Sequence, residues 1–173
     1  MSEARDRGGL QTGGNGEDAV ELRAHQKETM SENWTPGEVP PADENTAAYW
    51  DATREHRLTV QSCTACGAVQ HPPKALCTGC GSMEHLTQVD AAGTGTVDTF
   101  TVVHRAPRPE LSAPYTVARV RLSEGPVVLT RLEPAEPGET GWRIGDPVTV
   151  AWADLPDGRA LPYYTPATTS KEH

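Results

Sequence analysis

The sequence has few aromatic residues, few cysteines and no long apolar run. Aromatic side chains make up 5% of the 173 residues, and there is a single phenylalanine. No stretch approaches the roughly 20 apolar residues that a membrane-spanning helix needs, and the N-terminus lacks the basic-then-apolar order of a signal peptide. We therefore expect no membrane association. Cysteines kept as thiolates also fit a reducing compartment, so the sequence predicts a cytoplasmic protein.

Positive charge is scarce as well. The chain has 15 Lys and Arg against 24 Asp and Glu, which gives a net charge of −9 and a pI of about 5.1. A protein that binds nucleic acid needs a basic surface to displace counterions from the phosphates. Because the sequence has no Lys/Arg cluster of that kind, the charge argues against a nucleic-acid partner.

Glycine and proline are abundant, with 16 and 15 residues, and hydrophobic residues make up 36%. This composition predicts a loop-rich, mainly β protein with one modest core and a substantial disordered fraction. Residues 1–42 are predicted to be a disordered acidic tail, because glycines and prolines interrupt them and their apolar residues are too few to bury a helix face. Residues 167–173 are predicted to be a short polar tail.

All four cysteines lie in two matching Cys-x-x-Cys-Gly steps, at residues 63–67 and 77–81. Each step predicts a tight turn in which the glycine takes a positive φ and backbone N–H groups point at the sulfurs. Two such turns give a tetrahedral cage of four sulfurs that suits a closed structural zinc site. A single iron, as in rubredoxin, is the alternative metal, and disulfides or free thiols are the alternative without metal. The predicted metal ligands are Cys63, Cys66, Cys77 and Cys80.

A helix is predicted before the first cysteine step, within residues 43–57. It carries Tyr49 and Trp50, which we expect to pack into this protein's own core, with a subunit interface as the alternative. Residues 58–88 are predicted to form the zinc ribbon. Since four cysteines already complete the tetrahedron, His71 and His85 are expected to be surface residues of the ribbon.

Short strands separated by turn residues follow from residue 89 to residue 166. Strands are predicted at 96–104, 115–122, 127–132, 147–152 and 160–164, with a bend at Gly93-Thr94-Gly95. Five short strands in a segment of this length suggest a closed barrel of the OB type. The predicted fold is therefore mainly β: an N-terminal helix, a rubredoxin-like zinc ribbon and a five-stranded OB-fold barrel.

The order of these motifs resembles one known family. An aromatic helix is followed by Cys63-x-x-Cys66-Gly67, Pro72-Pro73, Cys77-x-x-Cys80-Gly81-Ser82, Gly93-Thr94-Gly95-Thr96-Val97, Val102-Val103-His104, Pro114-Tyr115, Leu122-Ser123-Glu124-Gly125-Pro126 and Ile144-Gly145-Asp146-Pro147-Val148. Over residues 43–166 the chain resembles the DUF35 proteins, which combine a rubredoxin-like zinc ribbon with an OB-fold and are often described as acyl-CoA-associated.

The resemblance implies a function that spacing alone does not give. DUF35 proteins typically accompany a thiolase-superfamily, hydratase or aldolase enzyme, and some help to hold the CoA or acyl group. We therefore expect a non-catalytic accessory subunit, and no catalytic set of residues is recognisable in the sequence. The first alternative is a stand-alone acyl-CoA-binding protein or enzyme. A second is a nucleic-acid-binding module with Phe100 and Tyr115 as stacking platforms, which the acidic charge opposes.

Acyl-CoA is a candidate ligand, and its phosphates would need cations. Arginines suit phosphate because the guanidinium can donate two hydrogen bonds at once. Arg119, Arg121 and Tyr115 are predicted to share one face of a strand, although an exposed face with ordinary solubilising charges is the alternative explanation. The candidate acyl-CoA-binding residues are His104, Arg105, Tyr115, Arg119 and Arg121, with Arg108 and Arg131 also lying on or beside barrel strands.

Overall fold

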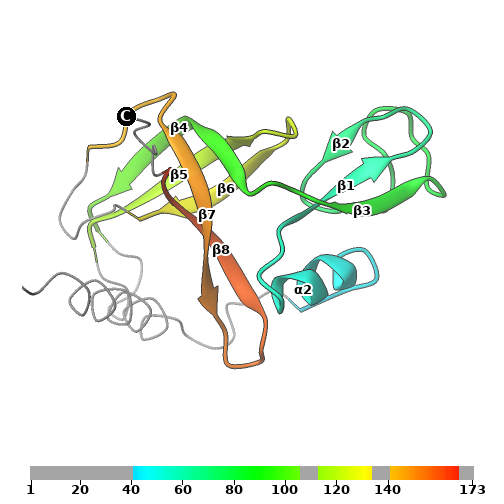
Figure 1. Cartoon of the computed structure of the whole chain (residues 1–173), viewed down its shortest axis with the longest axis horizontal. Coiled ribbons are helices and arrows are strands. Elements are labelled where there is room, and N and C mark those ends of the chain that lie inside the picture. The colour runs from blue at the N-terminus through cyan, green and yellow to red at the C-terminus, as the bar shows by residue number, and fades with distance from the viewer. Residues whose placement is uncertain (1–40, 106–112, 134–140, 168–173) are drawn as a thin grey trace, which may run out of the picture.

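The computed structural model describes residues 41–105, 113–133 and 141–167. The predicted tails at 1–42 and 167–173 lie almost wholly outside these residues, and Arg108 lies outside them too. Within these residues, Figure 1 shows a three-stranded sheet on one side of the molecule, a barrel on the other, and a short helix beside both. The predicted fold class is confirmed. Among the described residues, no helix is long and apolar enough to cross a membrane.

The helix α2 spans Ala47–Thr53 and is shorter than the predicted segment, in which residues 44–46 and 54–56 form turns. The Asp43 carboxylate accepts hydrogen bonds from the N–H groups of Asn45 and Thr46 and so closes the turn before it. At its other end His56 has a φ of 54°. The N–H of Arg57 reaches back to the carbonyl of Ala52 at 3.1 Å, which is the reversal that commonly ends a helix.

The ribbon sheet consists of β1 (Thr59–Cys63), β2 (Val69–Gln70) and β3 (Leu86–Asp90), in the order β2-β1-β3. Both pairings are antiparallel. The sequence predicts the first two strands, but β3 was not predicted. It pairs with β1 along its full length and continues past residue 88, where the ribbon was expected to end, before the chain enters the barrel.

The barrel has the five predicted strands: β4 (Thr94–Val103), β5 (Tyr115–Leu122), β6 (Val127–Leu132), β7 (Pro147–Asp154) and β8 (Ala160–Pro166). They close in the order β4-β5-β6-β8-β7. All pairings are antiparallel except that of β6 with β8, where Leu132 lies opposite Tyr164. This mixed closure of five strands is the expected OB architecture.

A bulge at Asp98 changes which side chains of β4 face the core. The register between β4 and β5 shifts between Val97 and Thr99, so that Asp98 is the extra residue. Val97 points inward before the bulge, and Phe100 points inward after it, packed against the core. Because one inserted residue reverses a strand's alternation, the interpretation of Phe100 as an exposed stacking platform is wrong.

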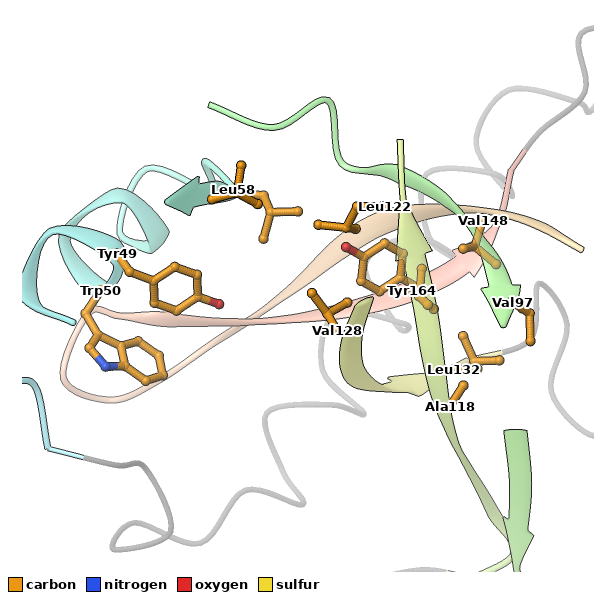
Figure 2. Close-up of a cluster of buried hydrophobic side chains, with 12 residues drawn as sticks. Tyr49, Trp50, Leu58, Val97, Ala118, Leu122, Val128, Leu132, Val148 and Tyr164 are labelled. Atoms are coloured by element: carbon orange, nitrogen blue, oxygen red, sulfur yellow. The ribbon is translucent and has the colours of Figure 1, made fainter. Parts of the chain in front are cut away.

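One hydrophobic core joins the helix, the ribbon and the barrel (Figure 2). Tyr49 and Trp50 of α2 are both buried, as expected of residues that pack into the protein's own core. Leu58 and Val60 contribute the ribbon side. The barrel side is formed by Val97, Ala118, Val120, Leu122, Val128, Leu132, Val148 and Tyr164. Because residues of all three parts share this core, they hold one another in place.

Candidate functional site

The two cysteine turns have the same backbone geometry. In the first, the N–H of Gly67 donates to the carbonyl of Cys63 at 2.8 Å, and in the second the N–H of Gly81 donates to the carbonyl of Cys77 at 2.9 Å. The two glycines have φ values of 75° and 74°. A residue with a side chain rarely adopts this conformation, which explains why glycine follows each Cys-x-x-Cys step.

The turns bring the four predicted ligands together. The Sγ atoms of Cys63 and Cys80 are 3.7 Å apart, those of Cys66 and Cys77 are 3.6 Å apart, and all four lie within 4.8 Å of one another. A tetrahedron with zinc–sulfur bonds of about 2.3 Å has edges of about 3.8 Å. The sulfurs therefore fit a tetrahedral metal ion, and four cysteine ligands leave it no open position.

The cage holds protons that a metal would displace. The N–H groups of Cys80 and Gly79 lower the pKa of the Cys77 thiol to about 6. For Cys66, the N–H of Ala68 is the largest single influence and lowers the pKa, but the thiols of Cys80, Cys77 and Cys63 together with burial outweigh it and raise the pKa to about 12. Metal binding is therefore expected to release protons and to weaken as the pH falls.

A buried pair of glutamines fastens the second cysteine turn to the sheet. Gln61 and Gln70 lie opposite each other on β1 and β2, and their amides are joined by a 2.5 Å hydrogen bond. The Oε1 of Gln70 accepts the N–H of Thr78 at 2.8 Å, and the Oε1 of Gln61 accepts the N–H of Lys74 at 3.0 Å. Sequence reasoning missed this pair, although two glutamines in strands otherwise facing a core were a usable signal.

We expect Gln70→Ala to weaken metal binding by about 10-fold, because the second cysteine turn loses the amide that positions it. Competition with a chromophoric chelator measures this affinity. Gln88→Ala is the matched control: it removes an amide from β3, on the other side of β1, and the Oε1 of this amide has no hydrogen-bond partner in the described part of the chain. Equal affinities for the two variants would contradict the positioning role.

His71 is half-buried, so the prediction that it is an exposed surface residue is wrong in part. It follows β2, and its ring packs edge-on against Tyr49 with 5.4 Å between the ring centroids. Its Nδ1 is buried and has no hydrogen-bond partner among the residues that the structure describes. Burial lowers the pKa of His71 to about 4, so the imidazole is neutral at physiological pH. His85, by contrast, is exposed as predicted.

His71 makes stability depend on pH. The unfolded residue titrates near 6.5 and the folded residue at about 4, so the unfolded state binds more protons between these values. The contribution of the neutral imidazole is present above pH 6.5 and is lost as the pH falls toward 4. We expect the stability difference between the wild type and His71→Gln to change by roughly 2 kcal/mol between pH 7 and 4.5.

Urea unfolding of both metal-loaded proteins at each pH measures this difference, and acid loss of metal affects both alike. His85→Gln is the control, because it removes an exposed histidine of the same ribbon. If the curve of His71→Gln parallels that of the wild type, His71 is not buried as described.

The structure places Tyr115, Arg119 and Arg121 on the outer face of β5, as the strand pattern predicts. Asp98 lies beside both arginines, because its bulge turns the carboxylate outward: it accepts a hydrogen bond from Arg121 at 2.9 Å, and its other oxygen is 3.7 Å from the Nε of Arg119. Both arginine side chains are more than half exposed. The face is therefore cationic, with one carboxylate at its centre.

His104 and Arg105 lie further along, just after β4, and are exposed. The pairing of Val103 with Tyr115 brings the end of β4 next to the start of β5. The guanidinium of Arg131, on β6, lies over the Tyr115 ring at 5.4 Å from its centroid. The structure thus brings these residues to one outer side of the barrel.

Comparison with known proteins gives two adjacent matches. Residues 50–85 match the model described as "ChsH2, rubredoxin-like zinc ribbon domain", and residues 88–153 match "ChsH2, C-terminal OB-fold domain". Among solved structures, the chain is similar to the "Ltp2-ChsH2(DUF35) aldolase", with 36% identity and a TM-score of 0.66 over 75% of this chain and 100% of that chain. The chain belongs to the DUF35 family. The four cysteines of this DUF35 protein are thus the metal-binding set of a zinc ribbon.

Other relatives share the fold or part of the sequence. A DUF35 family protein of unknown function from Sulfolobus solfataricus shares the fold at 11% identity, with a TM-score of 0.52 over 89% of this chain and 100% of that chain. A "Probable enoyl-CoA hydratase alpha subunit" from Thermomonospora curvata is 35% identical over 154 residues, which are 87% of this chain and 47% of that protein. A "3-oxo-4,17-pregnadiene-20-carboxyl-CoA hydratase alpha subunit" from Mycobacterium tuberculosis is 36% identical over 119 residues, 68% of this chain and 37% of that protein. This DUF35 protein therefore spans half or less of the length of these hydratase subunits.

Proposed function

We propose that this DUF35 protein is a non-catalytic accessory subunit that pairs with an enzyme acting on acyl-CoA substrates. The observation that carries the proposal is the 36% identity to the ChsH2 (DUF35) chain of an aldolase, all of which this chain covers. Two relatives named as hydratase alpha subunits and the aldolase support a partner of the hydratase or aldolase kind, and a thiolase-like partner is proposed from the resemblance to DUF35 proteins alone. Its location is proposed to be the cytoplasm, where thiolates stay reduced.

The metal is proposed to be zinc. The four cysteines Cys63, Cys66, Cys77 and Cys80 would hold it, and a closed site with four sulfurs supplies folding free energy rather than a reactive position. Iron in the same cage would be red in its ferric form, so the visible spectrum and metal analysis of the purified protein distinguish the two.

The outer side of the barrel is proposed to contribute to acyl-CoA binding. Arg119 and Arg121 would contact phosphate, with Tyr115, His104 and Arg105 further along the same side. Asp98 competes with phosphate for the same guanidinium groups. Removing the arginines and removing the Asp98 charge should therefore have opposite effects on CoA binding. Arg119→Gln with Arg121→Gln should weaken CoA binding by about 10-fold, and Asp98→Asn should strengthen it.

The partner is tested by affinity capture of the tagged protein from its native cells, with mass spectrometry of what is recovered. A hydratase-, aldolase- or thiolase-like protein in stoichiometric amount is the expected result. Recovery of the protein alone would favour a stand-alone acyl-CoA-binding protein or enzyme instead.

CoA binding is then measured by calorimetric titration of the captured complex. Arg143→Gln is the control for the arginine variants, because Arg143 is exposed and lies outside β5. If CoA binds the wild type and the double arginine variant equally, the outer barrel face is not the phosphate site.

A further inference from the structure

A pocket of about 170 Å³ lies between the ribbon, the helix and the barrel, away from both the metal cage and the arginine face. Its lining comes from all three parts of the protein. The residues are Tyr49, Leu58, His71, Val128, Leu129, Thr130, Leu161, Pro162 and Tyr164. An apolar cavity of about 150 Å³ is large enough for a benzene-sized molecule, so this pocket can hold a compound of similar size.

Two buried polar atoms of the lining have no hydrogen-bond partner among the described residues. Tyr164 is fully buried, and its hydroxyl makes no hydrogen bond within the described ranges. The Nδ1 of His71 is likewise buried and unpaired among those residues. Leaving a buried polar group unpaired costs about 1–3 kcal/mol, and native proteins seldom carry two such groups around one space without a bound molecule to satisfy them.

The hydroxyls converge on the pocket from opposite sides. Figure 2 shows the Tyr49 hydroxyl pointing from α2 toward the barrel and the Tyr164 hydroxyl pointing from β8 toward the helix. The Thr130 hydroxyl is not a free donor for a molecule in the pocket, because its Oγ1 already donates to the carbonyl of Pro162 at 3.3 Å. A molecule in the pocket would therefore meet two phenol donors and one imidazole nitrogen.

None of the described residues that line the pocket is a lysine or an arginine that could balance an anion. Burial keeps the imidazole of His71 neutral at physiological pH, and it raises the pKa of Tyr49 to about 12 and that of Tyr164 further still. Burial is the main cause of the raised pKa of Tyr164, and the neighbouring Tyr49 and Glu124 add to it. An unpaired carboxylate or phosphate would lose its hydration here without compensation.

We infer that this pocket binds a small uncharged compound with an apolar body and a hydrogen-bonding carbonyl oxygen, such as a ketone, an ester or an amide. The apolar body packs against Leu58, Val128 and Leu161, and the oxygen accepts from Tyr164. Leu129, whose side chain is 77% exposed, lies at the rim of the pocket and marks its entrance. The inference does not depend on the proposed partner or on the CoA face.

The test uses the zinc-loaded full chain and three probes: cyclopentanone, benzene and cyclopentanecarboxylate. Titrations are followed by amide chemical shifts in NMR spectra. Cyclopentanone should saturate shifts at the lining residues with a dissociation constant on the order of 1 mM. The carboxylate should bind at least about 10-fold more weakly, because nothing in the lining balances its charge.

Tyr164→Phe isolates the hydrogen bond, since it keeps the ring and removes only the unpaired hydroxyl. It should weaken the binding of cyclopentanone by about 10-fold, while the affinity for benzene stays within about 2-fold of the wild-type value. Its melting temperature should equal or exceed that of the wild type, because an unpaired buried polar atom is gone. Loss of cyclopentanone binding with an unchanged fold would support the inference.

Leu129→Trp provides an independent test that does not alter the core. It should block both neutral probes at the entrance, whereas Ile144→Trp, at an exposed position outside the lining, should block neither. The inference is overturned if no probe saturates the lining residues, if the carboxylate binds as well as the ketone, or if Tyr164→Phe leaves the ketone unaffected.

Discussion

Replacing Cys63 with serine is expected to release the metal and to unfold the ribbon. Cys63 is a buried cysteine of the cage at the end of β1, so its loss removes one of the four sulfurs. The loss also disturbs β1, the central strand with which β2 and β3 pair. Structural zinc contributes on the order of 10 kcal/mol to small ribbons. Metal analysis should fall from one ion per chain to none, with a large drop in melting temperature.

The damage should extend beyond the ribbon. Leu58 and Val60 belong to the same core as the barrel residues, so loss of the ribbon exposes the barrel side of that core as well. Thr87→Ser, at an exposed position on β3, should leave the metal and the melting curve unchanged. A Cys63→Ser protein that keeps its metal and melts like the wild type would refute the four-cysteine cage.

Gly95→Ala is expected to destabilise the barrel by about 2–3 kcal/mol. A Cβ at this position would lie 2.5 Å from the carbonyl oxygen of Arg121 and 2.9 Å from a methyl of Val120. The carbonyl is backbone of the paired strand β5, and the methyl belongs to the fully buried Val120, so neither can turn aside as the end of a flexible side chain could. The first strand of the barrel would have to move away from the second.

Gly141→Ala is the matched control, because a Cβ there would meet no atom within 4 Å. Chemical denaturation should show a lower midpoint for Gly95→Ala only, with an unchanged metal content, since the cage lies in the ribbon. Equal midpoints for the two variants would mean that β4 and β5 do not approach as closely as described.

The sequence was sufficient to predict the architecture because the patterns that encode the turns and strands are local. Cys-x-x-Cys-Gly encodes a turn geometry within five residues, and the alternation in β5 places Thr116, Ala118, Val120 and Leu122 inside. The resemblance to DUF35 proteins then predicted how the barrel and the ribbon combine. These features do not depend on where distant parts of the chain meet.

The features that could not be predicted depend on contacts between distant parts of the chain. His71 becomes buried only because α2 packs across it, and nothing in residues 68–73 reveals that helix. The bulge at Asp98 is visible only once β4 is aligned with β5, and it decides that Phe100 faces the core. The Gln61–Gln70 pair and the pocket at Tyr164 likewise arise from contacts between strands or between parts of the protein.

The barrel is expected to open more easily between β6 and β8 than between its other strands. These two strands meet at the single pair Leu132 and Tyr164, whereas β7 and β8 pair along their whole length. Local unfolding follows the least hydrogen-bonded boundary, so the amide of Glu133, which donates to the Tyr164 carbonyl, should exchange with solvent hydrogen earlier than the amides of β5. Tyr164, which also lines the pocket, therefore lies at the boundary of the barrel that is expected to open first.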